Sequence, residues 1–261
     1  MWAVLLGLAF RAADKMTKKV LADVADGISM VVTWIINLAP FGIFGLVFNT
    51  VSTNGLDIFT TYGKTVASSC RMYAVYLFVT NPLLVYWCIR QNPYPLIFHC
   101  LKRSALDSFL YKKFRTNIPV NMKVCEEMGL DRDTYSVTIP LGATINMDGA
   151  AITITVMTMA TAFTLGIHVD IPTAIILSLL AALSACGASG VAGGSLLLIP
   201  MACSLFGISD DISMQVVAVG FIIGVVQDSV ETALNSSSDL LLSASAEFRQ
   251  WRLEGKEIKF K

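Results

Sequence analysis

The chain has 261 residues, of which 55% are apolar and only 15% are charged, and its mean hydropathy is +0.66. This composition excludes a soluble domain of ordinary type and indicates a membrane protein. The net charge is zero, so the chain has no overall positive field that would attract nucleic acid.

The first third of the chain predicts two complete membrane spans. Residues 1–10 are apolar but fall short of the roughly 20 residues that a spanning helix needs, so we interpret them as the end of a span whose beginning is absent. A span is expected at 28–51, interrupted at Pro40–Gly42. The next is expected at 62–89, where Pro82 should bend the helix and free a carbonyl group.

The rest of the chain alternates polar connections with long apolar segments. Residues 90–103 contain two prolines and predict an aqueous loop, and an apolar stretch follows at 134–169. No charged side chain lies between Asp170 and Asp210, which is about twice the length of one crossing. Cys186–Ser195 reads C-G-A-S-G-V-A-G-G-S in the middle of that stretch, so we expect a re-entrant hairpin. The last span is expected at 213–246.

Positive charge predicts which ends face the cytoplasm. The basic segments should be cytoplasmic, while the turns near 53 and 168 are poor in Lys and Arg. The basic segments are Arg11–Lys19, Arg90–Arg103, Lys123–Arg132 and the tail after Phe248. With a hairpin that does not cross, these sides are mutually consistent and leave the C-terminus in the cytoplasm.

The last span carries a polar stripe. Its members share one face of an α-helix, at offsets of 3, 4, 7 and 11 from the first. They are Asp228, Glu231, Thr232, Asn235 and Asp239. A charge at the centre of a bilayer costs about 2.5 kcal/mol or more, so such a stripe normally marks a path for cations or substrate. The alternative is a helix end in water, with Ser236–Ser238 as its cap.

A second polar constellation interrupts the 134–169 span. Gly142, Asn146, Asp148 and Gly149 predict that the helix unwinds there and exposes carbonyl groups. Hard cations such as sodium prefer carboxylate, amide and carbonyl oxygens, which these residues would supply together with Asn235 and Asp239. The alternative is a packing kink without a ligand.

Other chemistry is disfavoured by the spacing of the reactive residues. The six cysteines show no C-x-x-C or Cys/His metal spacing, and His99 and His168 are too far apart in sequence to suggest a ligand pair. No Ser/Lys, paired-Asp or H-E-x-x-H arrangement for an intramembrane enzyme is present. A polar site beside a hairpin favours occlusion of a substrate over a continuous channel. We expect no enzyme activity and no cofactor other than sodium as a coupling ion.

Several motifs resemble those of one transporter family. They are N-M-D-G at 146–149, the glycine-rich hairpin, and D-x-x-x-T-x-x-N-x-x-x-D at 228–239. They are similar to motifs of the dicarboxylate/amino acid:cation symporters, the glutamate transporter family, and T-N-I-P-V-N and Q-D-S-V-E-T-A-L-N-S-S-S-D are similar to its bacterial sodium/serine-threonine members. The resemblance covers essentially the whole chain.

The resemblance implies an all-α membrane protein with two re-entrant hairpins, an elevator fold and a homotrimer in the bacterial inner membrane, surrounded by lipid. Its first spans would be missing here. Residues 1–55 would be a partial scaffold, 56–246 the transport domain and 247–261 a cytoplasmic tail. Within the transport domain, hairpin 1 would lie at about 96–131 and hairpin 2 at about 171–208.

The resemblance also implies roles for individual residues. Asp228 would hold the substrate amino group, with polar contacts from Thr232 and Asn235, and Val191 and Ser195 would lie at the tip of hairpin 2. The sodium ligands fall into three implied sets. The first is Gly142, Asn146, Asn235 and Asp239; the second is Thr144 with carbonyls of Ala185, Cys186 and Ala188; the third includes Asp148 and a helix that this chain lacks.

Position 231 bears on the substrate class. Acidic-substrate members carry Arg there, which pairs with a carboxylate, whereas this chain has Glu231, which would repel one and accept a hydrogen bond from a hydroxyl. Ala150 replaces their Thr. We therefore expect serine and threonine as substrates, imported with sodium by alternating access.

The tip of hairpin 1 departs from the family. Residues 110–121 read L-Y-K-K-F-R-T-N-I-P-V-N, where the family form is F-T-R-S-S-A-A-N-I-P-V-N. Lys113, Phe114 and Arg115 would bring bulk and unpaired charge to the substrate site, to which we also assign Lys112. Compensating frameshifts would explain this segment, and a diverged cytoplasmic loop is the alternative. An inactive fragment of a transporter is accordingly the second hypothesis for function.

Overall fold

The computed structural model describes residues 7, 9–54, 58–105, 117–188 and 193–258, and it is helical throughout, without strands in these residues. It divides into two units, residues 1–49 and 50–261. The all-α prediction is confirmed for the described part of the chain.

The first unit consists mainly of one helix. A short 3-10 turn at Phe10–Ala12 precedes α2 (Lys15–Asn54), which continues into the second unit. The helix runs without a break through Pro40–Gly42, so the predicted interruption is wrong. Proline and glycine are common in membrane helices, where neighbouring groups compensate for the lost hydrogen bond.

The second unit begins with a long helical path. It comprises α3 (Ile58–Val75), a π-helical turn (Tyr76–Thr80) and α4 (Asn81–Ile89). The π-helical turn lies directly before Asn81-Pro82, where the proline cannot donate a backbone hydrogen bond. Arg90 then ends α4 in the left-handed conformation, with φ 55°.

The segment after α4 differs from the aqueous loop expected at 90–103. It forms α5 (Tyr94–Cys100) and a π-helical turn (Leu101–Ala105). Leu96, Ile97 and Cys100 are buried in an apolar cluster with α4 and α12. The loop prediction is wrong because it gave weight to the basic residues and prolines of 90–103. The apolar residues between them form the buried face of a short helix.

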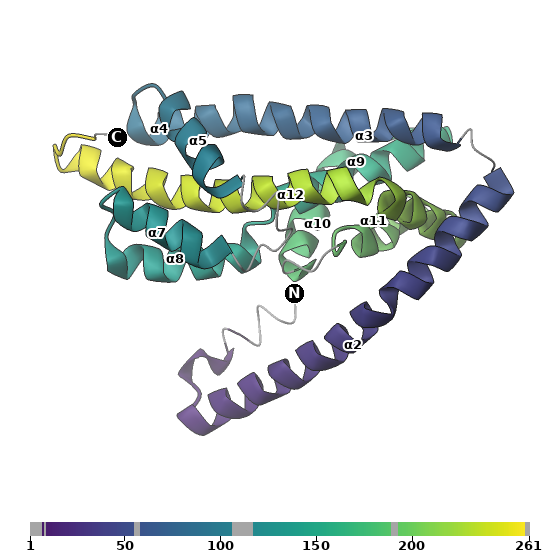
Figure 1. Cartoon of the computed structure of the whole chain (residues 1–261), viewed down its shortest axis with the longest axis horizontal. Coiled ribbons are helices and arrows are strands. Elements are labelled where there is room, and N and C mark those ends of the chain that lie inside the picture. The colour runs from purple at the N-terminus through teal and green to yellow at the C-terminus, as the bar shows by residue number, and fades with distance from the viewer. Residues whose placement is uncertain (1–6, 8, 55–57, 106–116, 189–192, 259–261) are drawn as a thin grey trace. The chain divides into compact units, whose positions relative to one another are not determined.

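The remaining helices surround the last one. They are α7 (Ile118–Glu127), α8 (Arg132–Ile145), α9 (Asp148–Thr164), α10 (Ile171–Ala188), a 3-10 turn (Leu196–Leu198), α11 (Ile199–Ser204) and α12 (Asp210–Leu253). Figure 1 shows α12 running along the middle of this unit. Its C-terminal half packs in a cluster with α4, α5, α7 and α8, and its N-terminal half packs with α9 and α11.

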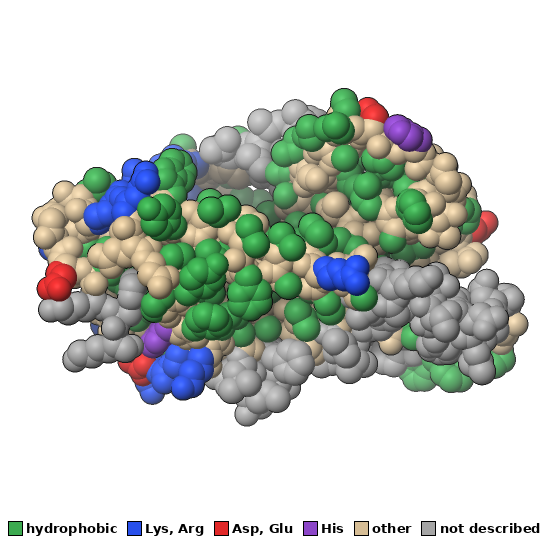
Figure 2. All heavy atoms as spheres, turned by 90° about the horizontal axis from the view of Figure 1, so that it is seen from above, with side chains coloured by type: hydrophobic (Ala, Val, Ile, Leu, Met, Phe, Trp, Pro, Cys, Tyr) green, Lys and Arg blue, Asp and Glu red, His purple; other side chains and the backbone are tan. Residues whose placement is uncertain are grey.

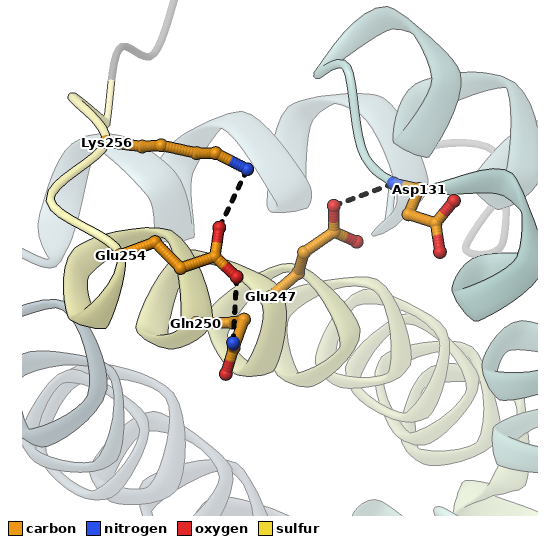
Figure 3. Close-up of polar contacts among 5 residues, drawn as sticks. All are labelled: Asp131, Glu247, Gln250, Glu254 and Lys256. Atoms are coloured by element: carbon orange, nitrogen blue, oxygen red, sulfur yellow. Dashed lines mark hydrogen bonds and ion pairs between the residues drawn. The ribbon is translucent and has the colours of Figure 1, made fainter.

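The segments before and after α8 show how local sequence sets a helix boundary. Gly129 follows α7 with φ 74°, a conformation that glycine adopts without strain. Asp131 then caps α8, because its carboxylate accepts hydrogen bonds from the Asp133 N–H and the Thr134 hydroxyl. The Asp131 N–H itself donates to Glu247 Oε1 of α12 at 2.7 Å (Figure 3).

The surface of the second unit is suited to lipid. In the described residues, Ala67–Ile89 and Arg132–Thr164 are long and apolar enough to cross a membrane, and the bent pair Asp210–Ile222 and Gln227–Leu253 would add a third span. Leu83, Trp87 and Phe163 are at least 65% exposed. Figure 2 shows apolar side chains over much of the visible face and charged side chains in a few separate places. This distribution is that of a protein whose solvent is a bilayer.

Candidate functional site

The break between α8 and α9 lies against the middle of α12. The helix ends at Ile145 and restarts at Asp148, and the Gly149 N–H donates to Asn235 Oδ1 at 2.7 Å. A Cβ atom at position 149 would lie 2.9 Å from the Glu231 carbonyl oxygen, so only glycine permits this approach. The unwound segment and the polar stripe, predicted separately, therefore meet at one place.

Asp239 is the carboxylate at the centre of this meeting point. It is 4% exposed, and its Oδ2 atom has no hydrogen-bond partner in the described part of the chain. A Cβ atom at Gly142 would lie only 1.7 Å from Asp239 Oδ1. Because glycine has no side chain, position 142 leaves room for the Asp239 carboxylate beside its backbone.

Asn146 connects the break to α12. The side-chain amide of Asn146 is oriented so that both its oxygen and its nitrogen have partners. The oxygen accepts from the Asp239 N–H at 2.9 Å and from Ser238 Oγ at 3.0 Å. Its nitrogen donates to Asp148 Oδ2 at 3.0 Å. Asp148 lies in the first turn of α9, where a carboxylate is favoured by the helix dipole.

These groups fit a hard monovalent cation. A buried carboxylate oxygen without a donor is costly, and a cation beside it would supply the missing interaction. Carboxylate, amide and carbonyl oxygens are the appropriate ligands. The described residues contain no group of three or more His, Cys, Asp or Glu side chains that could hold a metal ion.

The C-terminal end of α10 also reaches the break. Cys186 Sγ donates to the Ile145 carbonyl at 3.2 Å, and Ala185 is buried against residues of α8 and α9. Thr144, next to Ile145, donates its hydroxyl proton to Leu141 within its own helix. Two elements that the second implied sodium set requires, the end of α8 and the end of α10, therefore lie together.

The α10–α11 segment, described at 171–188 and 193–204, contacts the N-terminal part of the stripe through its second part. The Gly193 N–H donates to Asp228 Oδ1 at 3.3 Å, and Ser195 Oγ donates to Glu231 Oε2 at 3.0 Å. Gly193 has φ 68° and leaves no space for a side chain, because a Cβ atom there would lie 2.7 Å from Phe221 Cε1. Both stripe carboxylates of this region are thus bonded to the segment that was predicted to form hairpin 2.

For the remaining predicted site residues, the structure gives either burial alone or no description. Ala150 is 1% exposed and packs in an apolar cluster of α9 and α10, and Thr232 is partly buried on α12. Val191, Lys112 and Phe114 lie outside the described residues, as does the side chain of Ala188.

The alternative reading of the stripe as a helix end in water is wrong. Ser236, Ser237 and Ser238 are at most 3% exposed, and α12 continues beyond them to Leu253. Ser237 donates to the Ala233 carbonyl of its own helix. These serines are part of the packed interior of the second unit.

Comparison with known proteins gives the family of the chain. Residues 1–247 match the sodium:dicarboxylate symporter family. The chain belongs to that family. It is a family of transporters and not of enzymes, with sodium as the coupling ion and no organic cofactor.

Curated relatives within the symporter family are similar over nearly all of this chain. The serine/threonine transporter SstT of Bifidobacterium adolescentis is 58% identical over 259 residues, which are 99% of this chain and 60% of the relative. Two SstT proteins, from Streptococcus agalactiae serotypes Ia and V, are 58% identical over 246 residues, 94% of this chain and 61% of each relative. The chain therefore spans about 60% of the length of the curated relatives it matches.

A buried polar cluster of the second unit was missed by sequence reasoning. Asn117 Nδ2 donates to Ser236 Oγ at 2.5 Å and to the Ser104 carbonyl at 3.0 Å, and Asn121 Nδ2 donates to the Ser236 carbonyl at 3.1 Å. All four residues are at most 3% exposed. Two asparagines one helical turn apart in N-I-P-V-N were the available signal, but nothing in the sequence indicated their partner on α12.

Proposed function

We propose that this chain carries the substrate and sodium sites of a sodium-coupled symporter that imports serine, threonine and other small neutral amino acids. Asp228 would hold the substrate amino group, with Thr232 and Asn235 as polar contacts. Support for this substrate class comes from the names of the relatives and from the chemistry of the stripe. Serine and threonine are the substrates for which the SstT relatives are named.

The single observation that carries the proposal is the carboxylate of Glu231 in the buried middle of α12. Glu231 is 7% exposed and lies on the same helix as Asp228 and Asp239. A second carboxylate on the substrate would meet this group in a medium of low dielectric constant, where repulsion is strong. A hydroxyl on the substrate would instead donate a hydrogen bond. A neutral hydroxylated side chain is the better fit.

Sodium would bind at the meeting point of the α8–α9 break and α12. Asp239 would supply a carboxylate, Asn146 its amide oxygen, and Gly142 and Asn235 their carbonyls. The buried Oδ2 atom of Asp239 supports this assignment, because it has no donor among the described residues. A second ion would use Thr144 and the carbonyls of Ala185, Cys186 and Ala188, and Asp148 would belong to a third set.

Coupling requires that sodium and substrate favour the same closed state. The α10–α11 segment would close as a hairpin over the substrate, and residues 56–246 would move as a transport domain relative to the scaffold of a homotrimer. Residues 1–55 would belong to that scaffold. The intact protein would lie in the bacterial inner membrane, with the tail at 247–261 in the cytoplasm.

Uptake into liposomes tests the proposal. The purified chain is reconstituted, and entry of radiolabelled serine is measured with an inward sodium gradient and with potassium at equal ionic strength. Sodium-dependent, saturable uptake that excess threonine inhibits and excess aspartate leaves unchanged is expected. Stronger inhibition by aspartate than by threonine would contradict the substrate class, and unsaturable flux would favour a channel.

The second hypothesis, a chain that transports nothing, is favoured by the basic residues at 112–115. It is tested by restoring the T-R-S-S-A part of the family form at 111–115 with five substitutions. They are Tyr111→Thr, Lys112→Arg, Lys113→Ser, Phe114→Ser and Arg115→Ala. Uptake by the restored chain but not by the original would show that these residues block the substrate site. Equal uptake by both would refute this obstruction.

A further inference from the structure

One oxygen of Glu231 collects hydrogen bonds from three parts of the chain. Thr153 Oγ1 of α9 donates to Glu231 Oε2 at 2.5 Å, and Ser195 Oγ of the α10–α11 segment donates at 3.0 Å. Gln227 Nε2, one turn earlier on α12, donates at 2.5 Å. None of the four side chains is more than 7% exposed. These bonds fix the orientation of the carboxylate.

A further group lies behind these donors. The Tyr73 hydroxyl, from α3, is 2.5 Å from Thr153 Oγ1, and Gln227 Nε2 is 3.2 Å from the Tyr73 hydroxyl and 2.8 Å from Thr153 Oγ1. Tyr73 is 3% exposed. The cluster therefore joins α3, α9, α12 and the α10–α11 segment.

The protons of this cluster can be assigned so that every bond leads to Glu231, and the Thr153 hydroxyl also lies 3.0 Å from the Gly149 carbonyl of its own helix. A hydroxyl has a single proton, whereas the amide nitrogen of Gln227 has two. Tyr73 donates to Thr153, Thr153 donates to Glu231, and Gln227 donates to both Tyr73 and Glu231. Ser195 adds its own proton. Every chain of donors ends on Oε2, and none of these bonds uses Oε1.

We propose that Tyr73, Thr153 and Gln227 are positioning residues that orient Glu231 and, through it, hold Ser195 against α12. They direct Oε2 toward Ser195 and leave Oε1 to select a hydroxylated substrate. The inference rests on the proposed function, because a preference for hydroxylated amino acids can be measured only in a transporter of such substrates.

The same helix offers a matched control. Thr161 of α9 is 8% exposed, and its hydroxyl donates to the Met157 carbonyl of its own helix. Thr153→Val and Thr161→Val both remove a buried hydroxyl and retain the side-chain shape. Only the first change removes a bond to Glu231.

Transport kinetics give the first test. We expect Thr153→Val and Gln227→Met to raise KM for serine by about tenfold, the effect of about one lost hydrogen bond, with little change in Vmax. The preference for serine over alanine should fall by a similar factor, because alanine has no hydroxyl to be selected. Tyr73→Phe should act in the same direction more weakly, Thr153→Ser should restore the parent values, and Thr161→Val should resemble the parent.

Hydrogen–deuterium exchange gives a second test that does not depend on transport. Without serine or sodium, amides of residues 193–204 should exchange faster in Thr153→Val and Gln227→Met than in the parent or Thr161→Val. If Thr153→Val does not fold, Tyr73→Phe decides by the same two measurements. Exchange that is equal in the cluster variants and in Thr161→Val would overturn the proposal, and so would equal losses for serine and alanine. If the parent chain takes up no serine, the proposed function fails, and the exchange measurement alone decides whether these residues hold the segment.

Discussion

Glu231 and Asp239 lie about two turns apart on α12, and both are buried, but their surroundings differ. Glu231 Oε2 accepts from three protein donors, whereas Asp239 Oδ2 has none among the described residues. A buried acceptor that the protein satisfies fixes its neighbours in place. A buried acceptor that the protein leaves unsatisfied is costly, and a bound cation would offset that cost. The two carboxylates therefore differ in what the protein itself supplies to them.

The difference also separates two kinds of perturbation. Removing a donor around Glu231 should alter selectivity and the hold on the α10–α11 segment. Removing the charge of Asp239 should alter the response to sodium. Four predictions test this comparison at Asp239 and at sites farther from the two carboxylates, in order of decreasing effect.

The largest effect is expected for Asp239→Asn, which removes the charge that faces the proposed sodium ion. At sodium concentrations near 100 times its dissociation constant, the parent should gain about 2.7 kcal/mol of unfolding free energy, and the variant almost none. Thermal unfolding in detergent with sodium or potassium chloride measures this gain.

The matched control is Glu247→Gln on the same helix. Glu247 accepts from the Asp131 N–H (Figure 3). Asp131 caps the start of α8, whereas the α8–α9 break follows the last residue of α8, and Glu247 follows Asp239 by about two turns of α12. Its sodium response should equal that of the parent. A full sodium response in Asp239→Asn would refute the assignment of this carboxylate as a sodium ligand.

The next effect concerns the segment bonded to the Glu231 region. Gly193→Ala places a methyl group 2.7 Å from Phe221 Cε1 at a residue with φ 68°. Gly207→Ala meets nothing within 4 Å at φ 66°, so it has the same backbone strain without the clash. Gly193→Ala should therefore lose about 1–3 kcal/mol more unfolding free energy than Gly207→Ala.

A double variant checks the cause. Adding Phe221→Leu to Gly193→Ala removes the ring atom that the methyl group meets, and it should recover part of the lost melting temperature. Equal melting temperatures for Gly193→Ala and Gly207→Ala would mean that the segment moves aside freely and that its contact with α12 contributes little.

Sequence reasoning identified the site better than its surroundings. The stripe from Asp228 to Asp239 and the glycines at 142 and 149 were visible because polar and flexible residues are rare in apolar segments. Their partners were not visible. Tyr73 lies in α3, and its hydroxyl contacts Thr153 of α9 only because the helices pack together. A side-chain contact between distant segments has no local signal in a single sequence.

Errors in the fold have a similar origin. Pro40 predicted an interruption of α2, and the prolines near 93 predicted a loop, although both segments are helical. A proline limits its own backbone and removes one donor, but packing decides whether the helix continues. At α5 the decisive residues are Leu96, Ile97 and Cys100, which are at most 1% exposed.

A moderate effect is expected for Asn117→Ala, in the cluster around Ser236. The change leaves the Ser104 carbonyl and Ser236 Oγ without this donor, and buried unsatisfied groups cost about 1–3 kcal/mol. Melting temperature should fall while the serine-to-alanine preference stays constant. Ser237→Ala, which loses only bonds within its own helix, should change stability by less than about 0.5 kcal/mol. Altered selectivity at unchanged stability would move Asn117 into the substrate site.

The smallest effect is expected at the exposed end of α12. The Lys256 ammonium, with Gln250, lowers the pKa of Glu254, whose carboxylate lies 2.7 Å from Lys256 Nζ and accepts from Gln250 Nε2 at 2.8 Å (Figure 3). A lowered pKa means that this contribution to stability is present at neutral pH and is lost as the pH falls below the ordinary glutamate value. Solvent screens the pair, so Glu254→Gln should shift the melting temperature by less than about 1 °C at pH 7 and by a smaller amount at pH 3.5. A shift of several degrees at pH 7 would show that this turn supports α12, and that an exposed carboxylate here contributes as much as a buried one.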